Sequence, residues 1–167
     1  PVARMFAILA GYRQRILLLE GFFSGAELPE IMHHGFTIMV HAREQVQLLK
    51  TLRGDKKIDV FLKFNTGMNR LGFPAGDAAN VIEEVKALPC VDKIVLTTHF
   101  SDAEGVSGID WQMREFEDHV ARPGYGCSLA NSAAMLRFPE ARGDWVRPGI
   151  MLYGASPLDD ATALKLG

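Results

Sequence analysis

The segment NTGMNRLGF, residues 65–73, contains the residue types of an anion-binding loop. Two glycines and an asparagine surround Arg70 directly after an apolar run. Glycine allows a sharp turn with a positive φ angle, and a guanidinium can bind a carboxylate or phosphate through two parallel hydrogen bonds. A flexible turn with a solvated arginine is the alternative interpretation. The functional interpretation predicts a small anionic ligand at this loop.

Lys63 lies just before this loop, in the sequence FLKF at the end of the apolar run. If its side chain points inward, an unpaired ammonium group there is costly, so the lysine must be paired, neutral or modified. If it points outward at the strand tip, no such requirement exists. The residues alone leave both orientations open.

Three further segments could contact a phosphorylated ligand. His99 ends the run KIVLTTH and could transfer a proton, although most histidines in such positions are structural. In SLANSAAML, Ser132 begins a predicted helix whose free N–H groups could bind phosphate, or it is an ordinary N-cap. In WVRPGIMLYG, Pro148 keeps Arg147 out of helical geometry, and Gly149 lets a ligand approach the backbone. Together these features indicate a site for a phosphate-bearing cofactor.

Other kinds of site find little support. The two cysteines, Cys90 and Cys127, are too few for a disulfide scaffold and lack zinc-site spacing, so a reducing, cytoplasmic setting is expected. No Gly-x-Gly-x-x-Gly or Walker loop is present. The remaining histidines lack the pairing of a metal site and are expected at the surface or rim: His33, His34, His41 and His119. No metal is therefore expected.

The composition is that of one globular domain. The 167 residues include 18 Lys and Arg against 20 Asp and Glu, for a net charge of -2, and 48% are hydrophobic. Without a basic run, no nucleic-acid partner is expected. The apolar runs fall far short of the roughly 20 residues that cross a bilayer, so no membrane partner is expected. Because Pro1 opens a helical pattern, the chain is expected to begin inside a larger protein.

Apolar, β-branched runs alternate with runs of helical period along the chain. The predicted strands are residues 16–20, 37–40, 59–64, 93–99, 125–130 and 146–153. The predicted helices are residues 2–9, 26–34, 42–53, 78–88, 108–120 and 132–137. This alternation, without a hairpin signal, predicts an α/β fold with a parallel sheet covered by helices.

Local signals support several of these boundaries. Ser24 and Glu27 fit a capping box, and Gly35 and Gly54 suit left-handed helix ends. The helix at residues 108–120 is expected to pack through an apolar face rather than bind a cofactor; that face is Trp111, Met113, Phe116 and Val120.

Polar residues fall at or near the carboxyl ends of all six predicted strands. They are Glu20, His41, Lys63, Asn65, His99, Asn131 and Arg147. Catalytic barrels collect their chemistry at one mouth in this way, whereas an open sheet would concentrate it near one switch point. A complete barrel needs about 250 residues. The expected fold is therefore a partial (β/α)8 TIM-type barrel over residues 1–157, with about six of eight parallel strands.

With these motifs in hand, the chain resembles the alanine racemase family. The resemblance rests on ILLLEGFF at 16–23, LKFNTGMNRLGF at 62–73, TTHFSDAEG at 97–105, SLANSAAML at 128–136 and RPGIMLYGASP at 147–157. These motifs occur in the family's order across nearly the whole chain. The resemblance implies a (β/α)8 barrel that binds pyridoxal 5'-phosphate, followed by a carboxyl-terminal β domain, with residues 158–167 as the start of the linker.

The resemblance also implies roles for individual residues around the cofactor ring and substrate. Arg70 looks like the arginine that orients the substrate carboxylate. Lys63 looks like the lysine that is carbamylated in many members and holds Arg70 in place. His99 resembles the histidine beneath the ring, and Arg147 resembles the residue that faces the pyridine nitrogen.

A second group of residues resembles the family's phosphate cup. Ser132 and the backbone of Gly149 and Ile150 match the cup itself, and Asn131 matches the asparagine beside it. The cofactor-binding residues implied by the resemblance are therefore His99, Asn131, Ser132, Arg147, Gly149 and Ile150.

The implied activity is that of the intact enzyme. It interconverts L-alanine and D-alanine through a pyridoxal phosphate aldimine by a two-base mechanism, as a cytoplasmic homodimer that supplies D-alanine for peptidoglycan. The family's cofactor lysine lies upstream of Pro1, and its second base, a tyrosine, lies beyond Gly167. Because two-base chemistry needs a proton acceptor on each face of Cα, these residues alone are expected to be inactive.

Two alternative functions fit part of the same pattern. Another fold-sharing pyridoxal phosphate enzyme, such as an amino-acid decarboxylase, fits less well because no run of consecutive glycines is available for its phosphate loop. A non-catalytic pyridoxal phosphate homeostasis protein would suit the length, but such proteins lack an end strand like RPGIMLYG.

Overall fold

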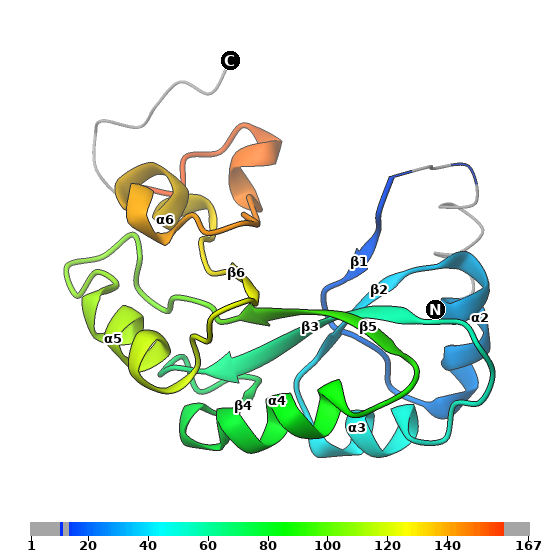
Figure 1. Ribbon diagram of the computed structural model, residues 1–167. Coiled ribbons are helices and arrows are strands. Elements are labelled where there is room, and N and C mark those ends of the chain that lie inside the picture. The colour runs from blue at the N-terminus through cyan, green and yellow to red at the C-terminus, as the bar shows by residue number, and fades with distance from the viewer. Residues whose placement is uncertain (1–10, 12–13, 159–167) are drawn as a thin grey trace.

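The computed structural model describes residue 11 and residues 14–158. A parallel sheet has the order β1-β2-β3-β5-β6, with β4 paired to β3 off this path (Figure 1). The strands are β1 (Leu17–Leu18), β2 (Thr37–Val40), β3 (Ile58–Asn65), β4 (Phe73–Pro74), β5 (Val91–Thr97) and β6 (Gly126–Ser128). Every pairing between them is parallel, which confirms the predicted α/β class.

Helices connect these strands. The α-helices are α2 (Leu28–His34), α3 (Arg43–Leu49), α4 (Ala78–Lys86), α5 (Asp110–His119) and α6 (Ser132–Arg137). The 3-10 helices are η1 (Gly25–Glu27), η2 (Ala75–Asp77), η3 (Pro139–Ala141) and η4 (Ile150–Tyr153). The capping box is confirmed, since the Ser24 backbone N–H donates to Glu27 at 3.0 Å. Gly35 ends α2 with a φ of 65°, as the sequence predicted.

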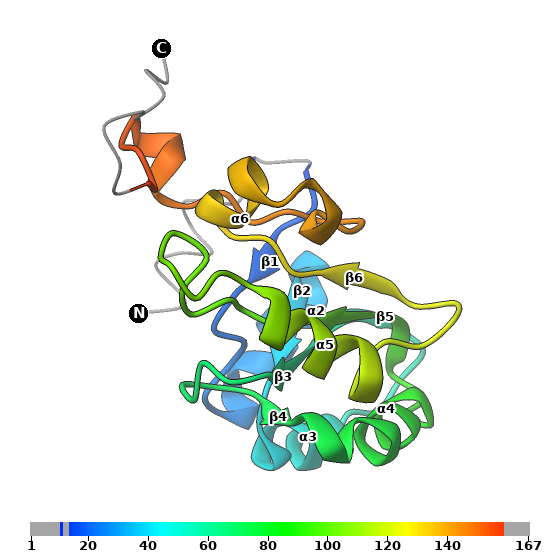
Figure 2. The same cartoon turned by 90° about the vertical axis from the view of Figure 1, so that its left-hand side faces the viewer.

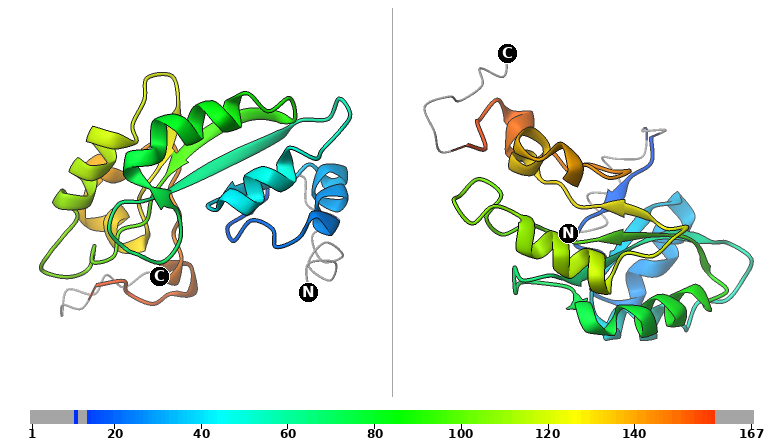
Figure 3. Two further views of the ribbon diagram at one scale, coloured as in Figure 1. Left: turned by 90° about the horizontal axis from the view of Figure 1, so that it is seen from below. Right: turned by 60° about the vertical axis from the view of Figure 1, so that its left-hand side comes forward.

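The two faces of the sheet differ in what covers them. Alternate residues of a strand point to opposite faces, and Val60, Leu62 and Phe64 of β3 are all fully buried in the main apolar core. Burying each such side chain contributes about 1.5–3 kcal/mol to folding. Helices α3 and α4 lie on this face, and the view from below shows α4 across the strands (Figure 3).

The opposite face carries Phe61, Thr37 and Val95, which line a cavity of about 200 Å³. Phe61 packs edge-on against Trp145 there, with ring centroids 5.8 Å apart. This inward face leads to the carboxyl ends of the strands. The parallel sheet and its helix-covered outer face are those expected of part of a (β/α)8 barrel.

Register brings three strand ends together. Lys63 of β3 pairs with Thr97 of β5, and Thr97 pairs with Ser128 of β6. Because the strands are parallel, the segments that follow them emerge at the same edge of the sheet. Figure 2 shows α5 and α6 at this edge, with α6 on the far side of the sheet from α3 and α4.

The strand predicted at residues 146–153 is wrong. Ile150–Tyr153 forms η4 instead, and the nearest strand contact is an isolated bridge between Trp145 and Ser128. Pro148 has no N–H to give to a ladder, and Gly149 has φ and ψ of -109° and -91°, which are not strand values. Apolar, β-branched composition therefore did not suffice to form a strand here.

Other differences are smaller. Strand β1 is limited to Leu17–Leu18, inside the predicted run of residues 16–20, and β4 was not predicted. The helix predicted at residues 2–9 and almost all of the predicted linker at 158–167 lie outside the described residues. None of the described helices has the length and hydropathy needed to cross a bilayer.

Candidate active site

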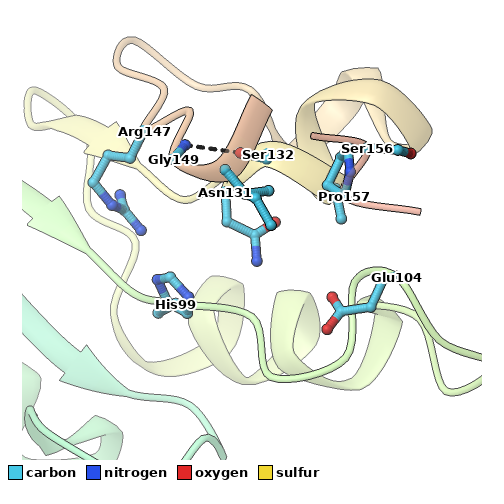
Figure 4. A pocket seen from close by; sticks show the side chains of 10 residues that line it. His99, Glu104, Asn131, Ser132, Arg147, Gly149, Ser156 and Pro157 are labelled. Carbon is cyan, nitrogen blue, oxygen red and sulfur yellow. Dashed lines mark hydrogen bonds between the residues drawn. The ribbon is translucent and has the colours of Figure 1, made fainter. Parts of the chain in front are cut away.

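A cavity of about 400 Å³ opens beside the carboxyl ends of β5 and β6. It collects six residues that the sequence assigned to cofactor binding: His99, Asn131, Ser132, Arg147, Gly149 and Ile150. Figure 4 shows Arg147 and His99 near one another, with Asn131 and Gly149 close by. Glu104, which the sequence reasoning did not single out, also lines the cavity.

Arg147 is held by backbone carbonyl groups. Its Nη1 donates to the carbonyl oxygen of Ser128 at 2.7 Å and also to the Ser128 hydroxyl. Its Nη2 donates to the carbonyl oxygens of Thr98 at 2.6 Å and Leu129 at 3.2 Å. Nε makes no hydrogen bond to any described residue. These bonds fix the guanidinium in one orientation at the strand ends and leave Nε as the donor without a protein partner.

Burial lowers the pKa of Arg147 to about 10, so the group is still a cation at neutral pH. A guanidinium has N–H donors and no acceptor. Arg147 can therefore donate to a neighbouring atom without protonating it.

Ser132 and Gly149 form a second part of the site. The Gly149 N–H donates to Ser132 Oγ at 2.8 Å, which joins the segment after β6 to the segment before η4. The N-cap of α6 is Asn131, whose Oδ1 accepts a hydrogen bond from the Ala134 N–H at 2.9 Å. The interpretation of Ser132 as the N-cap is therefore wrong, and its hydroxyl lies at the cavity instead.

His99 follows β5 and is partly buried. Burial is the largest cause that lowers its pKa to about 4, and the positive charges of Arg147, Lys63 and Arg70 lower it further. The imidazole is therefore neutral at physiological pH. A neutral ring can lie against an aromatic ligand without adding another charge to the site.

Lys63 points inward, which resolves the question of orientation that the sequence left open. Its exposed fraction is 7%. Burial, then the charges of Arg70 and Arg147, lower the pKa of its ammonium group to about 8. Its neighbour in register, Thr97, has a buried hydroxyl with no hydrogen-bond partner among the described residues. The strand end thus holds an ammonium group with no acidic partner and a hydroxyl with no hydrogen-bond partner among the described residues.

The Arg70 loop, residues 66–72, is shaped by the side chain of Asn65, the last residue of β3. Asn65 Oδ1 accepts hydrogen bonds from the N–H groups of Gly67 and Asn69, both at 3.0 Å. A Cβ at Gly72, where φ is +124°, would lie 2.8 Å from the Asn65 nitrogen. These contacts favour a shaped loop over the flexible-turn interpretation. Arg70 itself is exposed and has no hydrogen bond or ion pair with a described residue.

Sequence reasoning missed a buried amide on α5. Gln112 is fully buried, whereas Trp111, which was assigned to the packing face, is 45% exposed. Phe116 and Val120 are buried as predicted. Gln112 precedes Phe116 by four residues and so shares its helix face, and a polar residue at that position was the available signal. Among residues 14–158, no group of three potential metal ligands lies together.

Several alanine racemases are similar to this chain in sequence or fold. An alanine racemase from Nitrosospira multiformis is 50% identical over 161 residues, which cover 95% of this chain and 45% of that protein. The crystal structure of biosynthetic alanine racemase from Pseudomonas aeruginosa matches with a TM-score of 0.85 and 34% identity, over 99% of this chain and 46% of that one. An alanine racemase from Bartonella henselae with covalently bound pyridoxal phosphate shares the fold, with a TM-score of 0.81 at 22% identity.

The chain spans less than half the length of these relatives. The family model described as alanine racemase, N-terminal domain, matches residues 8–157, which is most of the chain. This protein therefore belongs to the alanine racemase family, and its residues correspond to the N-terminal domain.

Proposed function

We propose that this chain is the cofactor-binding barrel portion of an alanine racemase that interconverts L- and D-alanine with pyridoxal 5'-phosphate. The observation that carries the proposal is the cavity in which Arg147, His99, Ser132 and Gly149 meet. The family membership favours racemisation over the decarboxylase and homeostasis alternatives. The two proton-transferring groups are proposed to come from parts of the whole protein beyond this chain.

The residues present fit the proposed cofactor. The cavity, at about 400 Å³, falls within the usual range for small-molecule sites. A phosphate dianion suits hydroxyl donors. Because Ser132 Oγ accepts the Gly149 N–H, the hydroxyl proton of Ser132 is available to donate to a phosphate oxygen. The carboxylate of Glu104 would repel phosphate, so we place the phosphate at the Ser132 side of the cavity, away from Glu104 (Figure 4).

When bound, pyridoxal phosphate would draw electrons from the Cα of an attached amino acid and make its proton acidic. Arg147 Nε would donate a hydrogen bond to the ring nitrogen. Because guanidinium keeps its proton at working pH, that nitrogen would stay unprotonated, and the ring would be a weaker electron sink. This arrangement favours prompt return of a proton to Cα over transamination or elimination.

Other residues of the chain would orient the reactants. Neutral His99 would lie beneath the ring, where its lowered pKa keeps a charge away from the aromatic face. Arg70 would bind the substrate carboxylate, for which its exposed guanidinium is available. A carbamate on Lys63 would convert a buried cation into an anion that pairs with Arg70. That modification would remove the ammonium group, whose pKa is lowered first by burial and then by the charges of Arg70 and Arg147.

The wider setting is part of the same proposal. We propose residues 1–157 as the partial barrel and 158–167 as the start of the linker toward a β domain. The whole protein is proposed to be a cytoplasmic homodimer that supplies D-alanine for peptidoglycan. Its oligomeric state can be measured by light scattering of the purified full-length enzyme.

The experiment that tests the proposal uses the full-length protein. We expect it to racemise L-alanine and to bind pyridoxal phosphate with a characteristic visible absorbance. Ser132→Ala should raise the Kd for the cofactor about tenfold, because a hydrogen bond to a charged group contributes about 1.5–3 kcal/mol. Ser24→Ala, which changes a distant helix cap, should leave that Kd unchanged. A full-length protein that binds the cofactor but leaves alanine unracemised would reject the proposed activity.

A further inference from the structure

The first turn of α5 touches both loops that carry the proposed site. Trp111 and Gln112 are adjacent in this turn, and their side chains contact different segments. The helix itself is anchored by apolar side chains that are almost fully buried, which are Ile109, Phe116 and Val120. Figure 1 shows α5 beside the ends of β3 and β5. A helix anchored by buried side chains is therefore in place to hold two loops.

Gln112 holds the His99 loop, which we define as residues 98–109. Its Nε2 donates to the carbonyl oxygen of His99 at 3.1 Å. Its Oε1 accepts from the Ser101 N–H at 2.8 Å and from the Ser101 hydroxyl at 3.1 Å. Because a carbonyl only accepts and an N–H only donates, these partners fix the orientation of the amide. Gln112 thus holds the backbone by hydrogen bonds at His99 and Ser101, on both sides of Phe100.

The same amide reaches the Arg70 loop through Thr66. Gln112 Nε2 donates to Thr66 Oγ1 at 3.1 Å, and Thr66 Oγ1 lies 2.7 Å from Thr98 Oγ1. Thr98 uses its single proton toward the carbonyl oxygen of Phe64 at 3.0 Å. Thr66 must therefore donate to Thr98, and the chain of donors runs in one direction from Gln112 to Phe64. Every member is buried, so each hydrogen bond is costly to lose.

Trp111 contacts the Arg70 loop directly. A Cβ at Gly67 would lie 2.0 Å from two carbons of the Trp111 ring, so the ring rests against the bare backbone of that glycine. Gly67 has a φ of +133°, which other residues rarely adopt. The indole therefore limits where the backbone three residues before Arg70 can move.

Building on the proposed function, we propose that Trp111 and Gln112 are positioning residues that set the Arg70 loop and the His99 loop relative to one another. Gln112 fixes the backbone of His99, and Trp111 fixes the turn that presents Arg70. The two residues should therefore affect different properties of the enzyme. Loss of the Trp111 contact should weaken binding of the substrate carboxylate, whereas loss of the Gln112 bonds should misplace the ring beneath the cofactor.

The first test measures amide hydrogen exchange in the full-length protein without cofactor. In Gln112→Met, the Ser101 amide should exchange at least about tenfold faster, because its acceptor is lost. Trp111→Ala should raise exchange in residues 66–72 and leave Ser101 unchanged. This readout does not depend on racemase activity, so it distinguishes failure of this proposal from failure of the proposed function.

The chain offers a matched control in Gln45 of α3. Gln45 is also buried, donates to the Phe22 carbonyl at 3.1 Å and accepts from the His41 N–H at 2.8 Å. Gln45→Met removes equivalent bonds from other loops, so it should leave exchange of Ser101 and of residues 66–72 at the wild-type rate. If Gln112→Met does not fold, Thr66→Val removes one hydroxyl of the network and should speed exchange in both loops.

The second test measures kinetics and the cofactor spectrum of the holoenzyme. Trp111→Ala should raise KM for alanine about tenfold with kcat changed less than about twofold. Gln112→Met should lower kcat about tenfold with little change in KM and should shift the absorbance of the bound cofactor. Equal effects of Gln45→Met and Gln112→Met on exchange and spectrum, or unchanged Ser101 exchange in Gln112→Met, would overturn the proposal.

Discussion

The outer surface between α3 and α4 differs from the carboxyl ends of β3 to β6 in whether its charged side chains are paired. On the outer surface, Glu84 accepts hydrogen bonds from both Arg43 and Lys50, the latter at 2.8 Å. At the strand ends, Lys63 is a buried cation and Arg147 a partly buried one, and neither has an acidic partner among the described residues. The chain thus neutralises charge where solvent would tolerate it and leaves charge unneutralised where burial makes it costly.

The pKa directions express the same difference. The hydrogen bond from Lys50 is the largest cause that lowers the pKa of Glu84, which is the direction expected of a satisfied carboxylate. Burial and neighbouring cations lower the pKa values of Lys63 and His99, which is the direction expected where the positively charged form is destabilised. A positive region without acidic partners, such as the one at these strand ends, favours the binding of an anion.

The largest expected contrast comes from replacing one arginine in each region. Arg147→Lys in the full-length protein should lower kcat for alanine racemisation at least about 100-fold. Lysine has three N–H donors on one nitrogen, which cannot replace the four hydrogen bonds of the two Nη atoms and still present a donor to the ligand. Arg43→Lys should change kcat less than about twofold. Similar losses in both variants would remove the distinction between the two regions.

Replacing one lysine in each region should change stability in opposite directions. Lys63→Met should raise the unfolding free energy at pH 7 by about 1–3 kcal/mol, because the folded state no longer holds a disfavoured charge. Lys50→Met should lower it by less than about 1 kcal/mol. The measurement is chemical denaturation of the cofactor-free full-length protein in bicarbonate-free buffer.

The effect of Lys63 should depend on pH with a definite sign. Its folded pKa, about 8, lies below the ordinary value of 10.5. Between these values the unfolded chain binds the proton and the folded chain does not, so wild-type stability rises with pH relative to Lys63→Met. A wild-type protein that loses stability against this variant across the same interval would contradict the assignment.

Anion binding should also change the titration of His99. Inorganic phosphate should raise the proton affinity of His99 about tenfold, because a nearby anion contributes about 1.4 kcal/mol to the charged form. Histidine NMR of the full-length protein, with and without phosphate, measures this change, and Ser132→Ala should weaken it.

In the absence of phosphate, the unfolding free energy should fall as pH decreases from about 6.5 toward 4, since only the unfolded state readily protonates the His99 ring.

The smallest effect is expected at the outer surface. Glu84→Gln should change the unfolding free energy by less than about 1 kcal/mol, because exposed ion pairs contribute little. The difference from wild type should shrink between about 0.05 M and 0.5 M salt, as screening increases. A loss of unfolding free energy several times larger would contradict this prediction, because the ion pairs of Glu84 would then contribute as much to stability as the buried groups at the strand ends.

Much of this arrangement could be predicted from local pattern. Helix α4, predicted at residues 78–88, follows from apolar residues at helical spacing, and Val81, Ile82 and Val85 are buried in the structure. The alternation of strands and helices predicted a parallel sheet, whose strand ends must share one edge. The meeting of His99 and Ser132 at one cavity follows from that rule, whereas Arg147 reaches the cavity from a segment joined to β6 only by the isolated bridge between Trp145 and Ser128.

The prediction at residues 146–153 shows the limit of pattern. Apolar composition measures the tendency of a segment to be buried, but a strand also needs a neighbour that accepts its hydrogen bonds. Pro148 removes one donor, and the chain forms η4 instead. The assignment of Trp111 to the packing face failed for a related reason, because helical period alone does not show which loop a side chain meets.

The sequence by itself determined the α/β class, the family and the residue types at the strand ends, because these depend on composition, spacing and motif order. Only the tertiary structure decided that Lys63 points inward, that Arg147 is held by three backbone carbonyl groups and that Gln112 links two loops. These features depend on contacts between segments distant in the chain. Their energies come from burial and hydrogen-bond geometry, which no local pattern of residues contains.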